Sequence, residues 1–582
     1  MEQLKSRWTD KVDKNCPLPE YPRPQLRRER WKNLNGKYNY AILPCTIKRP
    51  QRFHGEILVP FGVESYLSGV GKTLNENQNL WYERTFTVPE TWKGEHVLLN
   101  FGAVDWKCRI WVNEKEVGYH TGGYSPFTFD ITDLLKDGDN TLTVKVYDPS
   151  DKGEQQRGKQ SQKPRSIWYT ATSGIWQTVW LEPVKENHIE KLWFIPDIDN
   201  NRVQFFGKSS LDQGEFQLDI SFKGESKAQV TVKSGDWISL DEPKLWSPEE
   251  PNLYDVKVTL MQDGAETDKA ETYFGMRKFS VGKDENGISR LFLNNKPYFQ
   301  RGLLDQGYWC ESQLTPPTDE SMVYDIEKMK SLGFNMLRKH IKVEPARWYY
   351  HCDRLGMIVW QDMVSGGHTS MMLSGFCSKL HIKPKDTHYF FFGRTNHYNR
   401  KDFEKELFEM IDDLRFFTSI YCWVIFNEGW GQFDTVRLTQ LVREEDPTRV
   451  IDHASGWFDR GVGDLRSVHQ YILPIPKVNP KDERVYVVSE YGGYSSVIDG
   501  HVFDKKRSFG YQMYKGKAEL TAAYRKLMEN QILPLVPKGL SGLVYTQLSD
   551  VELEVNGILT YDREKVKIDE DTIKELNEKL KY

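Results

Sequence analysis

Two glutamates stand where largely apolar runs of the sequence end. Tyr421 to Phe426 is one such run, and Asn427 and Glu428 follow it. Val485 to Ser489 is the other, and Glu490 follows it. Runs of this kind are typical of strands buried on both faces in a parallel sheet. A carboxylate at the end of a buried strand costs stability but suits proton transfer or nucleophilic attack, so we predict that Glu428 and Glu490 form one catalytic pair.

The elements that must position this pair alternate along the second half of the chain. Strand-like runs alternate with helical ones, which indicates an α/β fold with a parallel sheet. Thr318 is a predicted N-cap, Met322 to Met329 carries apolar residues at helical spacing, and Gly333 is a predicted helix stop. About 300 residues with eight strands fit a TIM barrel, whose chemistry lies at the carboxyl ends of the strands. Glu428 and Glu490 would follow the fourth and seventh of these predicted strands: Tyr298–Leu303, Phe334–Lys339, Met357–Gln361, Tyr421–Phe426, Arg449–Asp452, Ser467–Tyr471, Val485–Ser489 and Gly542–Gln547.

The first half of the chain shows short alternating strands and no helical period. A proline-rich arm, about residues 1–35, precedes them. Thr141 to Tyr147 alternates cleanly, and Asp137-Gly138 marks a turn. We predict three domains: an arm with a jelly-roll β-sandwich at 1–184, an immunoglobulin-like β-sandwich at 185–281 and the barrel at 282–582.

Composition excludes some classes of partner. The chain has 582 residues and a net charge of −4, which gives no basic footprint for nucleic acid. No apolar run approaches the ~20 residues of a membrane span, and the charged N-terminus is unlike a signal peptide. The seven cysteines show no CxxC pair, so free thiols in a reducing compartment are expected. We therefore predict a cytoplasmic protein without nucleic-acid or membrane partners and without a cofactor.

A long segment, Val364 to Asp402, follows the third predicted strand and therefore hangs over the catalytic face. Its four histidines match no common metal spacing, so no metal site is predicted there: His368, His381, His388 and His397. A lid or a subunit contact that shapes the substrate pocket is the preferred interpretation, and a homo-oligomer is possible.

Short motifs run in a fixed order through nearly the whole chain. They are Phe101 to Gly118 (FGAVDWKCRIWVNEKEVG), Ser173 to Trp176, Leu245 to Pro248 with Pro251 to Tyr254, Phe274 to Arg277, Leu293 to Pro297 with Arg301-Gly302, Asn427-Glu428 and Ser489 to Gly492. In this order they resemble the motifs of glycoside hydrolase family 2, the group of β-galactosidases, β-glucuronidases and β-mannosidases. Each motif alone would be a weak signal.

The resemblance implies an exo-acting, retaining hydrolase of terminal β-linked sugars that forms a covalent glycosyl-enzyme. Glu428 would be the acid/base and Glu490 the nucleophile, with the two carboxyl groups about 5–5.5 Å apart. Asn427 would bind the sugar 2-hydroxyl, and Tyr471 would hydrogen-bond the nucleophile. Asp305 and Asp362 are candidates to clamp sugar hydroxyls, and Trp430 and Trp457 are candidate stacking platforms. The other candidates for the sugar pocket are Arg338, His340, His469 and Gln547, and for every residue of both groups a purely structural role stays open.

The identity of the sugar is the least determined point. Family glucuronidases carry an Asn-x-Lys motif after strand eight, whereas Ser549 to Arg563 lacks it and holds Asp550, Glu552 and Glu554. Such an acidic loop would repel a uronic acid, so a neutral β-galactoside is favoured. β-Glucuronide, β-mannoside and an arabinoside stay open. A catalytically inactive carbohydrate-binding protein is the rival of another class.

Overall fold

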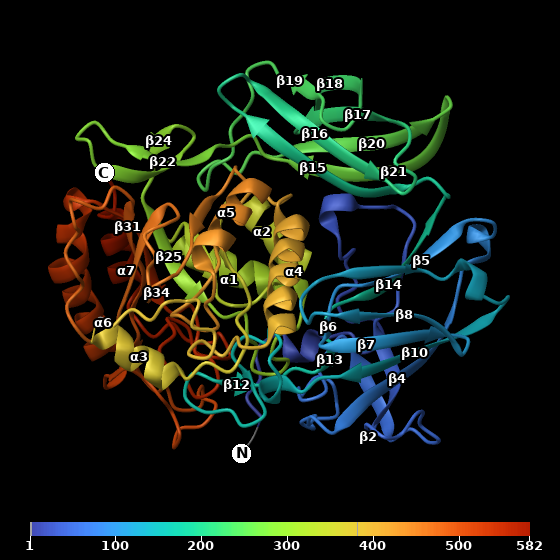
Figure 1. The fold of residues 1–582 in the computed structure, drawn as a ribbon, viewed down its shortest axis with the longest axis horizontal. Helices are drawn as coiled ribbons and strands as arrows, with labels where there is room; N and C mark the ends of the chain where they lie inside the picture. Colours follow the sequence, from blue (N-terminus) through green and yellow to red (C-terminus); the bar gives the residue numbers. More distant parts are fainter. Residues whose placement is uncertain (1–2, 381) are drawn as a thin grey trace.

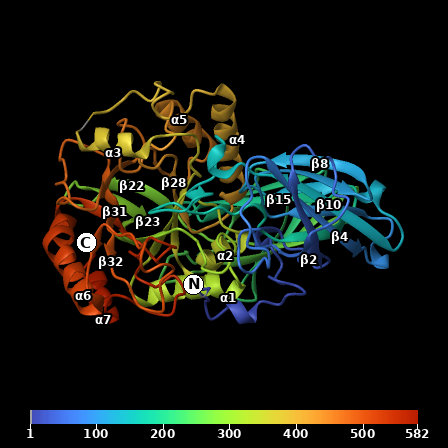
Figure 2. The same ribbon diagram turned by 90° about the horizontal axis from the view of Figure 1, so that it is seen from below.

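The computed structural model describes residues 3–380 and 382–582, so His381 lies outside the described residues. Three bodies are visible in Figure 1: a sandwich in blue, a second sandwich in green above it, and a barrel with its helices in yellow to red. Figure 2 shows the barrel and the first sandwich side by side. The three-domain architecture predicted from the sequence is confirmed.

The first domain packs two antiparallel sheets around an apolar core. Leu142, Val144 and Val146 are buried as the alternation of Thr141 to Tyr147 predicts, but Thr143 between them is buried as well. The larger sheet has the order β3-β2-β4-β10-β7-β8 and the smaller one β1-β14-β5-β9. The strands are β1 (Lys32–Asn33), β2 (Gly36–Pro44), β3 (Gly55–Val59), β4 (Gln78–Thr87), β5 (His96–Phe101), β7 (Lys107–Val112), β8 (Lys115–Thr121), β9 (Phe127–Asp130), β10 (Asp139–Tyr147) and β14 (Val179–Val184), with the short pairs β6 (Val104–Asp105) with β13 (Gly174–Ile175) and β11 (Gln160–Ser161) with β12 (Tyr169–Thr170).

The second domain is a smaller sandwich of two sheets. Their orders are β15-β16-β19 and β18-β17-β20-β21, and a separate three-stranded sheet then leads into the barrel. The strands are β15 (Ile189–Asp197), β16 (Arg202–Ser209), β17 (Glu215–Phe222), β18 (Glu225–Val232), β19 (Trp237–Ser239), β20 (Tyr254–Gln262) and β21 (Ala265–Phe274), followed by β22 (Phe279–Lys283), β23 (Ser289–Leu293) and β24 (Lys296–Pro297).

The third domain contains all eight predicted parallel strands, in one sheet of order β29-β28-β27-β26-β25-β34-β31-β30. The two end strands are neighbours, so the sheet is a nearly closed barrel. The strands are β25 (Gln300–Asp305), β26 (Met336–Lys339), β27 (Ile358–Asp362), β28 (Ile420–Val424), β29 (Val450–Asp452), β30 (Leu465–Gln470), β31 (Val485–Gly492) and β34 (Leu540–Thr546). The helices are α1 (Asp319–Ser331), α2 (Ala346–Leu355), α3 (Met371–Lys379), α4 (His397–Leu414), α5 (Thr435–Glu445), α6 (Gly516–Leu527) and α7 (Glu570–Glu578), and β32 (Tyr494–Ser495) pairs with β33 (Gln512–Met513).

Local sequence signals explain how these elements begin and end. The Thr318 side chain accepts a hydrogen bond from Ser321 N at the start of α1, as predicted, and Gly333 follows the helix with φ +86°. Side chains that point into the barrel, such as Met336 and Trp360, form one buried cluster. This cluster fills the interior of the barrel. The carboxyl ends of the strands lie beyond it and can therefore direct polar side chains toward a common opening.

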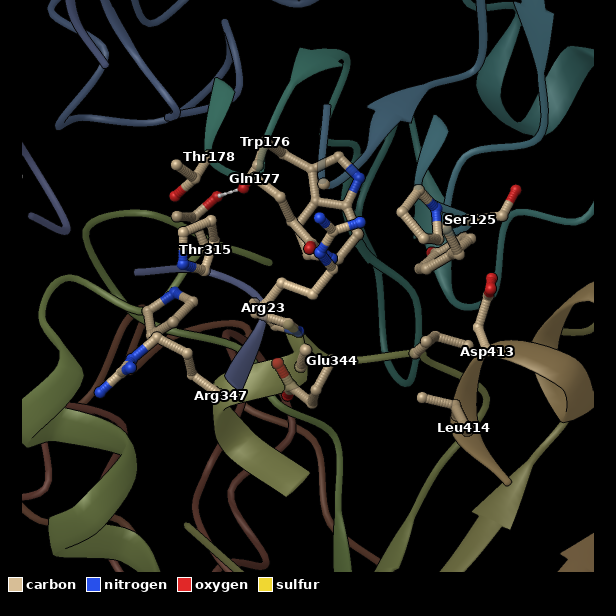
Figure 3. A pocket seen from close by; sticks show the side chains of 18 of the residues that line it. Arg23, Ser125, Trp176, Gln177, Thr178, Thr315, Glu344, Arg347, Asp413 and Leu414 are labelled. Atoms are coloured by element: carbon tan, nitrogen blue, oxygen red, sulfur yellow. Dashed lines mark hydrogen bonds between the residues drawn. The ribbon is translucent and has the colours of Figure 1, made fainter. Parts of the chain in front are cut away.

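A cavity of about 110 Å³ lies where the first domain meets the barrel (Figure 3). Trp176 and Gln177 line it from the first domain, and Arg347 and Asp413 line it from the barrel side. Neither predicted catalytic glutamate lines it. The cavity therefore belongs to the contact between domains and not to the predicted catalytic face.

All seven cysteines are free thiols. Among residues 3–380 and 382–582, the structure contains no helix that is long and apolar enough to cross a membrane.

Candidate active site

Glu428 is held in an unusual backbone conformation just beyond β28. Its φ is +50°, a left-handed value that non-glycine residues seldom adopt. The neighbouring strand end stabilises it, because Glu428 N donates to Ser455 O at 2.9 Å and Ser455 N donates to Phe426 O at 2.8 Å. Strain that the surroundings hold in place in this way is a mark of functional sites. In this conformation the Glu428 carboxylate contacts His469.

Glu490 lies within β31, where the strand pairing is irregular. The register of β31 against β34 shifts between Val488 and Tyr491. Such a bulge re-aims side chains, and here both Ser489 and Glu490 contact groups inside the barrel opening. The structure thus places Glu490 at the carboxyl end of the seventh strand, as expected.

The surroundings of Glu490 favour its ionised form. Its carboxylate accepts a hydrogen bond from Arg338 Nη1 at 3.2 Å and another from the hydroxyl of Tyr471. Burial alone would raise the pKa of Glu490, but the neighbouring His469 and His340 rings, the Arg338 guanidinium and the Tyr471 hydroxyl outweigh it and lower the pKa to about 2. A carboxylate that is ionised at every working pH is suited to nucleophilic attack.

The two glutamates and His469 form one compact cluster. One carboxylate oxygen of Glu428, one of Glu490 and a ring nitrogen of His469 all lie within 4.8 Å of one another. His469 Nδ1 is 2.9 Å from Glu428 Oε1, and its Nε2 is 3.6 Å from Glu490 Oε1. Three groups at this spacing could also ligate a cation. Their place at the barrel opening, with one carboxylate held ionised, equally allows two-carboxylate chemistry.

Arg338 organises the floor of this cluster. Its Nε and Nη2 bind the two oxygens of Asp362 at 2.8 and 2.9 Å, and Nη2 also donates to Asn427 Oδ1 at 2.9 Å. Its side chain is fully buried. Because Arg338 takes the amide oxygen of Asn427, the amide nitrogen remains as a donor, and no partner for it is found among the described residues. The predicted neighbours Arg338, Asn427 and Glu490 therefore do meet.

Asp362 and His340 support Arg338 and are not arranged to clamp sugar hydroxyls. Asp362 has both oxygens engaged, since His340 Nδ1 lies 2.9 Å from Oδ2 in addition to the contacts with Arg338. Burial lowers the pKa of His340 well below its ordinary value, and the charge of Lys159 lowers it further. His340 is therefore neutral, and Arg338 supplies the lasting positive charge beside Glu490.

Asp305 does not join the cluster, which corrects the expectation of a sugar clamp. Its carboxylate binds Lys339 Nζ at 2.6 Å and accepts from Gly307 N at 2.9 Å. Lys339 also binds Glu344 at 2.8 Å. Because side chains alternate along a strand, Lys339 faces away from the side that Arg338 occupies, and Asp305 pairs with it in a buried charge cluster outside the barrel.

The predicted aromatic platforms differ from each other. Trp430 is 3% exposed, its ring packs edge-on against Trp168, and Arg157 lies over it. Little of its face is open to a sugar, so its expected platform role is not supported. Trp457 remains partly exposed and contacts the helix α3 near Gly375. It stays a candidate wall of the pocket.

Gln547 is fully buried beneath the loop that follows β34. Its amide nitrogen donates to Asn556 Oδ1 at 2.7 Å. Its amide oxygen has no partner within the part of the chain that the structure describes. Gln547 therefore supports this loop from below, and its expected contact with a sugar stays a prediction.

The long segment after β27 does cover the catalytic side. Its helix α3 packs through Cys377 against Phe392 and Phe458, and Phe458 belongs to the loop after β29. Phe376 and Met372 of α3 remain exposed. The segment therefore borders the opening, and a role as lid or subunit contact stays a prediction.

The acidic loop after β34 carries less repulsive charge than its sequence suggests. Asp550 binds Lys567 Nζ at 2.6 Å, and burial raises the pKa of Glu552 to about 7. Glu554 accepts hydrogen bonds from the Tyr169 hydroxyl and from Asn556. Each acid is thus paired, hydrogen-bonded or partly neutral, which weakens the sequence argument against an anionic sugar.

Some residues of the site were not identified from the sequence. The loop of residues 153–172 belongs to the first domain and contacts the barrel. Within this loop, Lys159 Nζ lies 5.7 Å from the centre of the Tyr169 ring. Tyr511 stacks on Tyr471 at 4.2 Å, and Ser455 contacts His469. The loop has no periodic pattern and lies far from the glutamates in sequence, so only the fold reveals that it reaches the barrel.

Family comparisons match all three domains. Models described as "Glycosyl hydrolases family 2, sugar binding domain", "Glycosyl hydrolases family 2" and "Glycosyl hydrolases family 2, TIM barrel domain" match residues 67–183, 187–277 and 288–531. A β-galactosidase of Priestia megaterium is 23% identical over 512 residues, 80% of this chain and 45% of the relative. A putative β-glucuronidase of Formosa agariphila is 25% identical over 450 residues, 72% of this chain and 51% of the relative. The chain thus spans about half the length of these relatives.

Solved structures share the whole fold at low sequence identity. The β-D-glucuronidase of Dictyoglomus thermophilum superposes with a TM-score of 0.76 at 17% identity, covering 96% of this chain and 99% of that one. A β-galacturonidase of Eisenbergiella tayi bound to galacturonate gives a TM-score of 0.70 at 18% identity, covering 96% and 100%. At this identity the likeness shows the fold.

Proposed function

Because this chain belongs to glycosyl hydrolase family 2, we propose that it is an exo-acting hydrolase that removes a terminal β-linked sugar with retention of configuration. The observation that carries the proposal is the spacing of the glutamates, with one oxygen of each within 4.8 Å. Retaining enzymes need carboxyl groups about 5–5.5 Å apart, whereas inverting enzymes leave about 6.5–9.5 Å for a water molecule.

In the first step, a Glu490 oxygen attacks the anomeric carbon. The bond from that carbon to the leaving oxygen breaks, its electron pair stays on the oxygen, and Glu428 gives that oxygen a proton. The low pKa of Glu490 keeps its attacking electron pair available, and Arg338 and Tyr471 hold the carboxylate in place. The product is a sugar covalently bound to Glu490.

In the second step, water replaces Glu490 on the anomeric carbon. Glu428, now a carboxylate, takes a proton from the water as the new carbon–oxygen bond forms, and the electron pair of the broken bond returns to Glu490. Two displacements at one carbon restore its original configuration. We infer that the Asn427 amide nitrogen donates to the sugar 2-hydroxyl throughout, since Arg338 already binds the amide oxygen.

The stereochemical claim is tested by proton NMR of the first sugar released. The β-anomer must appear before mutarotation produces the α-anomer, whereas immediate α-anomer would refute retention. The rival interpretation as an inactive binding protein would be supported if a broad panel of aryl glycosides showed no turnover while calorimetry detected sugar binding.

A β-galactoside remains the candidate sugar favoured by the sequence. A β-uronide is the second candidate, and Lys159 is the observation in its favour. Lys159 is half-buried on the catalytic side, and its ammonium group has no hydrogen bond or ion pair among residues 3–380 and 382–582. Its loop is fixed, since Gly158 N and Arg157 N both donate to Ser365 O at 3.0 Å. An unpaired ammonium on a rigid loop beside His340 suits a substrate carboxylate.

A panel of nitrophenyl glycosides separates these candidates: β-D-galactoside, β-D-glucuronide, β-D-galacturonide, β-D-mannoside and α-L-arabinopyranoside. If the sugar is anionic, Lys159→Gln lowers kcat/KM for the uronide by about 10- to 100-fold and changes neutral glycosides by less than about 3-fold. Lys163→Gln, an exposed lysine of the same loop, is the matched control. Equal losses on all sugars would reject an anion-binding role for Lys159.

A further inference from the structure

His469 contacts both catalytic carboxylates through different ring nitrogens. Its Nδ1 lies 2.9 Å from Glu428 Oε1 and its Nε2 lies 3.6 Å from Glu490 Oε1. The imidazole is 1% exposed, so neither nitrogen is open to a sugar. This geometry disfavours the substrate-binding role expected from the sequence and raises the question of what the imidazole does between the two acids.

The surroundings of Nε2 decide which nitrogen carries the hydrogen. Ser455 Oγ lies 2.9 Å from Nε2 and donates its own hydrogen to Ser489 Oγ at 3.0 Å. Ser467 Oγ lies 2.5 Å from Ser489 Oγ, which completes a buried cluster of three hydroxyls. A serine oxygen whose hydrogen is already directed elsewhere is an acceptor. The hydroxyl cluster therefore favours a hydrogen on Nε2, donated to Ser455.

The charged groups around the ring agree with this arrangement. Glu490 faces Nε2 with a carboxylate, which favours an N–H there. Arg338 Nη1 lies 3.4 Å from Nε2 but has stronger acceptors in Ser489 O at 3.1 Å and Glu490 Oε1 at 3.2 Å. His340 also lies on this side, 4.0 Å from Glu490, and the buried acids Asp362 and Asp452 lie near the ring. Within the described part of the chain, Glu428 is the hydrogen-bonding partner of Nδ1.

We propose that His469 is a positioning residue that holds the acid proton of Glu428 on the line between Glu428 Oε1 and His469 Nδ1. With the hydrogen at Nε2, Nδ1 offers a lone pair, so the short contact at 2.9 Å needs a proton from Glu428. The pair thus carries its catalytic proton at rest. The inference rests on the proposed function, in which Glu428 is the acid.

The arrangement matters in both steps. Before the first displacement, it keeps the proton on the Glu428 side of the cleft and fixes the direction of the carboxyl group. After Glu428 has given the proton to the leaving oxygen, its carboxylate faces a lone pair on Nδ1. That repulsion favours the uptake of a proton from water as the water attacks the glycosyl-enzyme. The pair thus gives one proton to the leaving oxygen in the first step and regains one from water in the second.

Kinetics with two leaving groups test the inference. His469→Phe should lower kcat/KM about 100-fold for phenyl glycosides, which need the acid, and by less than about 3-fold for 2,4-dinitrophenyl glycosides, which do not. The basic limb of the kcat/KM profile should also move to lower pH. His469→Asn, which places an amide oxygen near the position of Nδ1, should recover most of the loss and guards against a folding defect of the Phe variant. Equal losses for both leaving groups, with an unchanged pH profile, would overturn the inference.

Nitrogen NMR of the full-length protein labelled with ¹⁵N-histidine gives a readout that needs no turnover. His469 is identified by the signals that vanish in His469→Asn. We expect Nε2 to be protonated near neutral pH. The ¹⁵N chemical shift of Nδ1 should be that of a nitrogen that accepts a hydrogen bond or shares a proton. A neutral ring protonated at Nδ1 would refute the inference even if the enzyme is active. If no glycoside is turned over, the NMR result still stands, so the two failures are distinguishable.

Discussion

Replacing Arg338 should separate the stability of the barrel from its chemistry. Arg338→Met removes both hydrogen bonds to the buried carboxylate of Asp362 and leaves it with the neutral His340 ring and Ile341 N as its partners. Breaking a buried ion pair from one side costs about 3–5 kcal/mol. A barrel of about 300 residues unfolds with an entropy of about 0.6 kcal/mol/K, so Tm should fall by about 5–8 °C. The loss of the contacts with Glu490 and Asn427 should lower kcat/KM by about 10³-fold.

A second change at Asp362 tells the two effects apart. Arg338→Met combined with Asp362→Asn removes the unpaired charge and keeps an acceptor for His340, so most of the lost Tm should return while kcat/KM stays low. Arg338→Lys is the control that keeps the charge without the two-pronged geometry. Differential scanning fluorimetry and kcat/KM on the best aryl glycoside provide the measurements. A single variant with unchanged Tm, or a double variant with restored activity, would refute this account of Arg338.

Three further changes have defined outcomes. Tyr471→Phe removes a hydrogen bond to ionised Glu490, so kcat/KM should fall by about 10- to 100-fold, which steady-state kinetics would show. Asn427→Ala should cost about 100-fold on a normal glycoside and almost nothing on its 2-deoxy analogue, because the amide serves the 2-hydroxyl. Burial raises the pKa of Asp413 to about 7, so its neutral form is preferred and its stabilising effect is lost as pH rises from about 4 through 7. Asp413→Asn should therefore raise Tm at pH 8 and leave it nearly unchanged at pH 4; the opposite order would contradict the burial of this carboxyl group in the cavity of Figure 3.

The barrel was predictable because its signals are local. Each strand is a short apolar run. Helix α1 is bounded by two local signals, the N-cap Thr318 at its start and Gly333 just after its end. The two glutamates stood out because polar residues follow buried runs abruptly. Arg338 and Tyr471 were placed correctly for the same reason, since both end a strand of the barrel or lie next to its end.

The sequence did not predict which face of its strand Asp305 or Asp362 takes, nor which residues of another domain reach the site. Asp305 and Asp362 both end strands, but Asp305 pairs with Lys339 while Asp362 pairs with Arg338, the adjacent residue on the opposite face. Sequence spacing does not settle which face a strand-end carboxylate takes. Lys159 reaches the site from another domain, through a loop without periodicity, so no pattern near the glutamates indicates it.

The central claim is that Glu490 is the nucleophile and Glu428 its acid/base partner. A 2-deoxy-2-fluoro glycosyl fluoride of the sugar identified by the panel should inactivate the enzyme, and peptide mass spectrometry should place the label on Glu490. The label should be absent in Glu490→Ala and should still form in Glu428→Gln, because a fluoride leaving group needs no acid. A label on Glu428 or on any other side chain would contradict the assignment.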